Sequence, residues 1–209
     1  MDQAQCKNLQ PDQTAFGPGE LSHNDHIEGE RLGIEQVGNQ SAPEARRPVA
    51  LRRGGQALAC SDAFFGPMNN LIAPGRAVNM GGGWETKRRR TPGSDWILVQ
   101  LGEVGKVGLV EIDTNHFKGN YPDRCALWGI YAPGARITEL MLAKSWKCIL
   151  PESKVTASQR HFFRKELDAL GPFTHVRLEI FPDGGVSRLR VYGKPSGASE
   201  LPLKSDLEA

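Results

Sequence analysis

Apolar and polar residues alternate with a period of two in several short stretches of the second half of the chain. In residues 174–181 (THVRLEIF), every second residue from Val176 to Ile180 is apolar, and the residues between them are polar or charged. Successive side chains of a strand point to opposite faces of a sheet, so this pattern predicts a strand with one buried face. Residues 187–193 (SRLRVYG) repeat the pattern.

Several other segments have the length and composition of short strands. They are residues 95–102, 107–114, 124–131, 145–150 and 159–165. The four residues EVGK (103–106) predict a hairpin or short connection. Residues 61–72 predict a short helical turn capped by Ser61 or Asp62. Frequent Gly and Pro turns and the lack of a long amphipathic helix predict an all-β fold, an antiparallel jelly-roll β-sandwich.

The organisation along the chain is a single domain between two unpatterned ends. Residues 1–54 are rich in Gln, Asn, Pro, Gly and charge, with no lasting period, which predicts a divergent or disordered N-terminal segment. Residues 195–209 predict a disordered tail. Residues 55–194 are the predicted domain, and a chain of 209 residues suits one domain.

Charge is distributed unevenly, and this favours an anionic ligand. Residues 51–194 carry 21 basic and 13 acidic residues, a balance of +8, whereas residues 1–50 carry 4 basic and 8 acidic residues. The basic run Lys87–Arg90 lacks the interleaved aromatic residues of a nucleic-acid patch, so no nucleic-acid partner is predicted. It is either a solvated face or an anion-facing sheet edge, on which Arg88 and Arg90 would share one side.

The sequence also favours some compartments and cofactors over others. No run approaches the roughly 18 apolar residues of a membrane span, and the first residues lack a signal pattern, so we expect a soluble, cytoplasmic protein without a membrane partner. The cysteines lie far apart without a CxxC pair, so free thiols are expected. The domain's histidines show no HxH or HExxH spacing, so no metal or other cofactor is predicted, with a divalent metal as the alternative.

The densest polar cluster is residues 111–124 (EIDTNHFKGNYPDR), a strand followed by a turn, where a rigid sandwich presents functional residues. It offers a base, a proton shuttle, a cation and an amide donor: Asp113, His116, Lys118 and Asn120. Each has a structural alternative. His116 can be a half-buried or capping residue, and Asp113 can cap its turn through Thr114 or Asn115.

A second cluster is residues 180–190 (IFPDGGVSRLR), in which Asp183-Gly184-Gly185 predicts a tight hairpin turn. Asp183, Arg188 and Arg190 are then expected at the mouth of the sheet. A guanidinium group there can hold a carboxylate through two parallel hydrogen bonds.

Five sequence blocks together resemble the allantoicase family, in the family's order and spacing over residues 56–194. They are MGGGWETKRRR (80–90), SDWILVQLG (94–102), GLVEIDTNHFKGNYPDRC (108–125), RHFFRKEL (160–167) and THVRLEIFPDGGVSRLRVYG (174–193). The resemblance implies a galactose-binding-like jelly roll. It also implies a hydrolase that acts on C–N bonds of linear amidines, converting allantoate and water to ureidoglycolate and urea in purine degradation.

The substrate that the resemblance implies makes chemical sense of the polar clusters. Allantoate is a small carboxylate with two ureido groups on its central carbon, so its hydrolysis needs a cationic clamp, donors for the urea oxygens and a proton-transfer pair. The hypothetical catalytic residues are Glu85 or Asp113 as base and His116 as acid. The hypothetical substrate-binding residues are Arg88, Arg90, Lys118, Asn120, Asp183 and Arg188.

Allantoicases resemble tandem duplications, whereas this chain contains one copy, which is most similar to the family's second copy. We therefore expect a homo-oligomer that replaces the missing repeat, or else a weak or inactive enzyme. The alternative function is a noncatalytic module that binds a small anion or a sugar, because fold alone does not decide function.

Overall fold

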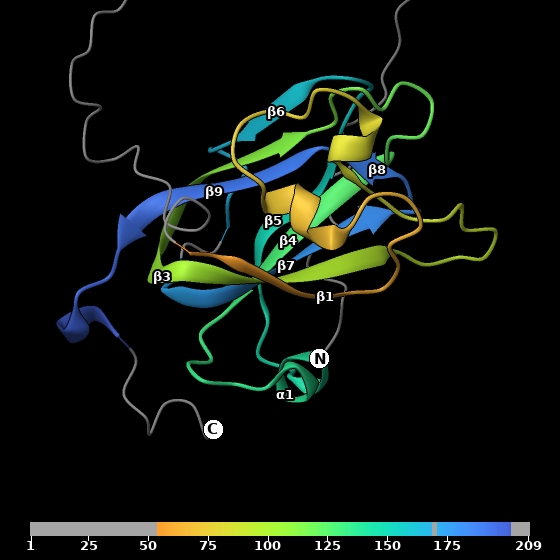
Figure 1. Cartoon of the computed structure of the whole chain (residues 1–209). Coiled ribbons are helices and arrows are strands. Elements are labelled where there is room, and N and C mark those ends of the chain that lie inside the picture. The colour runs from red at the N-terminus through yellow and green to blue at the C-terminus, as the bar shows by residue number, and fades with distance from the viewer. Residues whose placement is uncertain (1–53, 169–170, 202–209) are drawn as a thin grey trace, which may run out of the picture.

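Figure 1 shows the computed structural model, which describes residues 54–168 and 171–201. The predictions for residues 1–53 and 202–209 lie outside the described residues. The first part of the predicted tail is described: the last strand continues to Pro195, and a 3-10 turn, η5, follows at Ala198–Glu200.

Antiparallel strands are the main secondary structure of the described chain, as the alternating pattern predicts. They are β1 (Gln56–Cys60), β2 (Trp84–Glu85), β3 (Asp95–Asp113), β4 (Arg124–Ile130), β5 (Lys147–Lys154), β6 (Arg160–Phe163), β7 (Phe173–Phe181), β8 (Gly185–Val186) and β9 (Arg188–Pro195). The main hydrogen-bonded path runs β1-β3-β7-β4-β5, with β6 and β9 also paired to β3, and β2 pairs with β8. The fold is therefore an all-β antiparallel sandwich, which confirms the predicted fold class.

Strand β3 belongs to both layers of the sandwich. Its first part, up to Gln100, pairs with β1 and β7, and its second part, from Gly105, pairs with β9 and β6. The hairpin predicted at 103–106 is therefore wrong, because the chain continues as one strand that passes from one layer to the other. A register shift between Gln100 and Gly105, which still pairs with Phe173 of β7, marks where the strand moves from β7 to β9; a second shift, between Val107 and Leu109, lies within the pairing with β9.

The hydrophobic core fills the space between these layers. Val176, Leu178 and Ile180 of β7 are fully buried, as are Leu189 and Val191 of β9, so the predicted inward positions are confirmed. They join one cluster with apolar residues from both parts of β3. Packing of this core therefore determines which strand ends lie at the same end of the sandwich.

The outer face of the β1-β3-β7-β4 layer is also partly covered. The helix α1 (Ile137–Leu142) and its flanking loops pack Leu140 and Trp146 against Leu98 and Ile130, and Figure 1 shows α1 below this layer. No helix in residues 54–168 or 171–201 is long and apolar enough to cross a membrane.

Two turns differ from their predicted form. Asp183-Gly184-Gly185 is not a hairpin turn, because β8 pairs with β2 and β9 pairs with β3 rather than with β7; the segment is a corner between layers. The helical turn predicted in residues 61–72 is present as the 3-10 helix η3 (Met68–Ile72), but Pro67 is its N-cap and makes no side-chain cap. Ser61 Oγ donates instead to Asp95 Oδ1, at 2.9 Å.

Candidate functional site

Loops from several parts of the chain meet at one end of the sandwich, where the short β2–β8 ladder joins them. Glu85 of β2 lies opposite Gly185 of β8, and its backbone also bridges to Phe65. The backbone N–H of Gly185 donates to the carbonyl of Asn120 at 2.7 Å. These bonds bring the turn 114–123, the β7–β9 corner and the loop that carries the basic run to the same end.

Asp113 is the last residue of β3 and lies opposite Arg188 in the β3–β9 ladder. Its side chain is 1% exposed; Oδ1 accepts the backbone N–H of Asn115 at 2.9 Å, and Oδ2 lies 3.6 Å from Nε of Arg76. The capping bond to Asn115 is thus present. The same carboxylate faces a cation, so it also has the surroundings of a charged group held in place.

The side chain of Arg188 is bonded to a loop rather than directed into an open site. Residues 73–83, here called the strap, pass over the start of β9, where Arg188 donates from Nε to the carbonyl of Gly75 at 3.1 Å and from Nη1 to that of Gly82 at 2.6 Å. Burial lowers the pKa of Arg188, and the Asp113 carboxylate opposes this shift. Two of the nitrogens that a bidentate clamp needs are therefore already bonded to the strap.

His116 lies in the left-handed backbone region, with φ of 72°, which is uncommon for a residue other than glycine. Its ring Nε2 is 2.9 Å from the carbonyl oxygen of Ala77 in the strap, and its backbone N–H donates to Ser158 Oγ at 3.3 Å. A carbonyl only accepts, so Nε2 carries the hydrogen and Nδ1 of the neutral ring has the lone pair. An imidazole held in this way has one nitrogen left to exchange protons.

Glu85 and Asn120 form a direct pair near the strap. Asn120 Nδ2 donates to Glu85 Oε1 at 2.6 Å and lies 3.9 Å from Sδ of Met80. Lys118 is exposed on the same turn as Asn120. Asn120, the predicted amide donor, is therefore hydrogen-bonded to Glu85, which was predicted as a base.

Asp183 is bonded to the loop that carries the basic run. Its Oδ2 accepts the backbone N–H of Arg89 at 2.7 Å, and the Arg89 side chain in turn donates from Nη2 to Oδ1 of Asp95 at 2.6 Å. Asp95 is 2% exposed. Two carboxylates thus fix the backbone and the guanidinium group of Arg89.

The basic run lines a shallow pocket of about 360 Å³, here called the basic pocket. Its lining residues are Ser61, Asp62, Lys87, Arg88, Arg89, Arg90, Thr91 and Asp95. The run lies outside any strand, so the predicted alternation, with Arg88 and Arg90 on one side and Lys87 on the other, is wrong. A turn lets consecutive side chains reach one space, which a pleated strand does not.

The predicted site residues therefore fall into two neighbouring groups. Asp113, His116 and Arg188 all contact the strap or its Arg76, whereas Arg88 and Arg90 line the basic pocket. These two groups do not share the lining of that pocket, and they are connected through the β2–β8 ladder.

A family model described as an allantoicase repeat matches residues 49–196. The chain belongs to the allantoicase family. A probable allantoicase from Pseudomonas aeruginosa is 53% identical over 160 residues, which are 75% of this chain and 48% of the relative. One from Pseudomonas savastanoi pv. phaseolicola is 52% identical over 149 residues, 71% of this chain and 45% of the relative.

Solved structures agree with the fold. The crystal structure of allantoicase from Saccharomyces cerevisiae matches with a TM-score of 0.61 and 35% identity, covering 73% of this chain and 44% of the yeast chain. A C-terminal domain of a chitobiase from Bacteroides fragilis matches with a TM-score of 0.52 at 11% identity, which supports the sandwich fold alone. The chain spans less than half the length of its allantoicase relatives.

Sequence reasoning missed three members of the allantoicase-like site. Arg76, which faces Asp113, lies in an unpatterned loop far along the chain, and no spacing rule connects the two. Arg89 and Asp95 form an ion pair across a turn. Arg89 belongs to the basic run, but the strand interpretation pointed it away from Arg88 and Arg90.

Among the described residues of this chain, no group of three or more His, Cys, Asp or Glu side chains is placed to hold a metal ion. Cys60, Cys125 and Cys148 are free, in line with the expected free thiols. Burial raises the pKa of Cys125 to about 12, so this thiol is inert as a nucleophile near neutral pH.

Proposed function

We propose that this chain hydrolyses allantoate to ureidoglycolate and urea, as a hydrolase acting on C–N bonds of linear amidines. The observation that carries the proposal is the identity of more than half of the residues with probable allantoicases across the whole sandwich domain. The second support is the buried Asp113 beside Arg76, followed three residues later by the His116 imidazole, whose Nε2 is bonded to the strap.

In this proposal Asp113 and His116 form the proton-transfer pair. A water oxygen bonds to the central carbon of allantoate, the bond from that carbon to one ureido nitrogen breaks, and the departing nitrogen takes a proton. Asp113, or Glu85, accepts the proton of the water, and His116, in its imidazolium form with both ring nitrogens protonated, delivers the proton from Nδ1 to the leaving nitrogen and is reprotonated from solvent. The bond from His116 Nε2 to Ala77 fixes the ring for this step.

The remaining predicted residues bind the substrate's polar groups. Asn120 and Lys118 steady the ureido carbonyl and the anion, since an amide and an ammonium group supply donors. Arg88 and Arg90 take the carboxylate, and Asp183 holds the loop from which they extend. Arg188 keeps the strap and Asp113 in place, because its Nε and Nη1 already have carbonyl acceptors.

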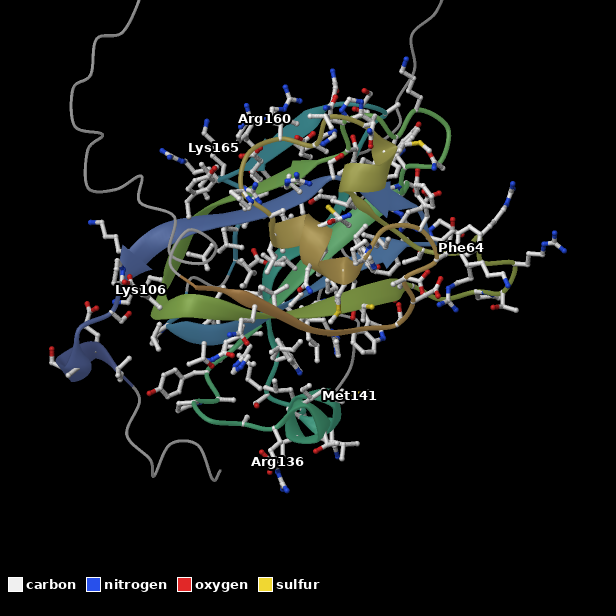
Figure 2. The ribbon with its side chains drawn as sticks, viewed as in Figure 1. Phe64, Lys106, Arg136, Met141, Arg160 and Lys165 are labelled. Carbon is white, nitrogen blue, oxygen red and sulfur yellow. The ribbon has the colours of Figure 1, made fainter. Side chains whose placement is uncertain are left out.

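A homo-oligomer is part of the proposal, because the relatives are about twice as long as the region they share with this chain. Phe64 and Val78 are 66% and 86% exposed, and both lie on loops near the candidate site. Figure 2 shows Phe64 pointing outward at this end of the sandwich. Exposed apolar side chains that cluster near a site are typical of contact surfaces. The mass in solution at assay concentration tests for pairing.

Urea release from allantoate by the purified chain tests the function, with Asp113→Asn as the decisive variant. Asparagine keeps an oxygen for the Asn115 N–H but removes the base, so we expect kcat to fall by about 100-fold or more. Asp123→Asn is the matched control, because Asp123 is an exposed carboxylate of the same sequence block. Wild-type turnover by Asp113→Asn would remove this residue from the scheme. Allantoate binding without urea release by the wild type would favour the binding module.

A further inference from the structure

The basic pocket is lined by more cationic than acidic side chains. Its lining contains four cationic and two acidic side chains, which leaves a formal charge of +2. Asp62 already accepts the backbone N–H of Lys87 at 2.6 Å, and Asp95 accepts from Ser61 Oγ at 2.9 Å and from Arg89 Nη2 at 2.6 Å. Both acids are thus bonded within the protein.

Arg89 is the member of the lining that is held in a defined position. Its backbone is bonded to Asp183 and its Nη2 to the buried Asp95. The turn at Gly93, with φ of 140°, lies against it, because a β-carbon at Gly93 would be in ordinary van der Waals contact with Arg89 Nη1, at 3.4 Å. An arginine fixed in this way loses little side-chain freedom when it binds a ligand.

The guanidinium group of Arg89 is only partly buried, with 29% of the side chain exposed, so part of it is open to the pocket while Nη2 is bonded to Asp95. The flanking Arg88 and Arg90 are exposed and line the same pocket. One fixed guanidinium group and two exposed ones therefore border a single space.

We propose that the basic pocket is an oxyanion-binding site built on Arg89, with the partly exposed guanidinium group of Arg89 as the fixed cation and Arg88 and Arg90 closing on the bound group. The chemical class is a compact oxyanion, a carboxylate or a phosphate, because a guanidinium edge matches two of its oxygens. The identification of the bound group as the carboxylate of allantoate rests on the proposed function. The existence of the oxyanion site does not rest on it.

Binding is measured by calorimetry with allantoate and with inorganic phosphate as separate probes, at low and at high salt. We expect at least one probe to bind the wild type, and the affinity to fall as salt rises. In Arg89→Lys the charge remains but the planar guanidinium fork is lost, so we expect binding to weaken by about tenfold or more. Equal affinity in Arg89→Lys and wild type would overturn the proposal.

Arg177→Lys is the matched control, because Arg177 repeats the contacts of Arg89 outside the pocket. Its Nη2 is 2.7 Å from Glu179 Oε1. We expect this variant to bind the probes within about twofold of wild type. The double variant Arg88→Gln, Arg90→Gln changes only exposed side chains, so it gives an answer even if Arg89→Lys does not fold. It too should bind about tenfold more weakly.

The two proposals fail in different ways. If a probe binds and Arg89→Lys weakens that binding while the wild type releases no urea, the oxyanion site stands and the proposed function fails. If urea is released with an unchanged KM by Arg89→Lys and by the double variant, and both bind allantoate and phosphate as tightly as wild type does, the function stands and the oxyanion site fails. If only phosphate binds at the pocket, the site stands and the ligand is not the substrate's carboxylate.

Discussion

Two sets of arginines at the same end of the molecule are used in opposite ways. Arg188 and Arg190 of β9 are directed at backbone carbonyls of residues 71–82, with Arg190 Nη2 at 2.5 Å from Ala73 and 2.9 Å from Gly75. Arg88 and Arg90 of the basic run are exposed and line a pocket. The first set holds a loop onto the sheet, and the second set is open to an anion.

The difference teaches that local packing, and not residue type, decides what a guanidinium group does. On β9 the neighbouring strap brings unpaired carbonyls over the sheet, so the arginine donors are used to satisfy them. On the loop 86–94, which projects from the sandwich (Figure 1), the side chains of Arg88 and Arg90 have no such cover. The comparison predicts opposite effects of mutation on stability and on ligand binding.

The largest expected effect on stability is that of Arg188→Met. The variant removes the donors that bond to the carbonyls of Gly75 and Gly82 and leaves Asp113 buried, with Arg76 at 3.6 Å as its ion-pair partner. We expect the free energy of unfolding to fall by roughly 3 kcal/mol. Urea denaturation measures this. Arg88→Met is the paired control, and an equal loss in both variants would erase the distinction between the two sets.

Arg190→Met should destabilise less, by about 1–2 kcal/mol, because Arg190 is only partly buried and its strap carbonyls are closer to solvent. The strap should loosen locally, so the amide hydrogens of residues 73–83 should exchange faster than in wild type. Hydrogen exchange followed by mass spectrometry tests this. Unchanged exchange of the strap would mean that Arg190 does not hold it.

His175 offers a contrast with Arg188, because a buried imidazole can lose its charge and a guanidinium group does not. Burial lowers the pKa of His175 below its usual value of 6.5. The folded state then binds fewer protons than the unfolded state, so this contribution is complete above pH 6.5 and is lost as pH falls below it. His175→Gln should flatten the pH dependence of the unfolding free energy, by at most about 1.4 kcal/mol per pH unit. An unchanged slope between pH 5 and 6.5 would contradict this assignment.

The smallest effect on stability is expected for the double variant Arg88→Ala, Arg90→Ala, within about 0.5 kcal/mol of wild type. Its KM for allantoate should nevertheless rise by about tenfold, since two charged donors are lost. Lys165→Ala removes a similarly exposed charge near β6, away from the pocket (Figure 2), and serves as the control. A variant with lower stability and unchanged KM would reverse the roles assigned to the two arginine sets.

Much of the fold follows from local patterns in the sequence. The alternation around Val176 and around Leu189 predicts buried strand faces, and both are buried. The prediction failed at residues 103–106, where a short Gly-containing segment was interpreted as a turn. Composition cannot tell a turn from a strand that changes layers, because the deciding contacts are the pairings with β7 and β9, which come some 70 residues later in the chain.

The candidate site was predictable only in part. Asp113, His116, Lys118 and Asn120 are close in sequence, so one strand end and one turn necessarily bring them near each other. Arg76 and the strap carbonyls reach the same place from another part of the chain, and only packing brings them there. The commitment of Arg188 to the strap is of the same kind.

The sequence by itself determined the strand periodicity, the basic body and the family, because these depend on residue types at fixed short spacings. The tertiary structure alone decided which arginines are bonded to backbone and which face a pocket. The physical reason is that a guanidinium group binds whichever acceptors lie within hydrogen-bond reach, and folding brings those acceptors from distant parts of the chain.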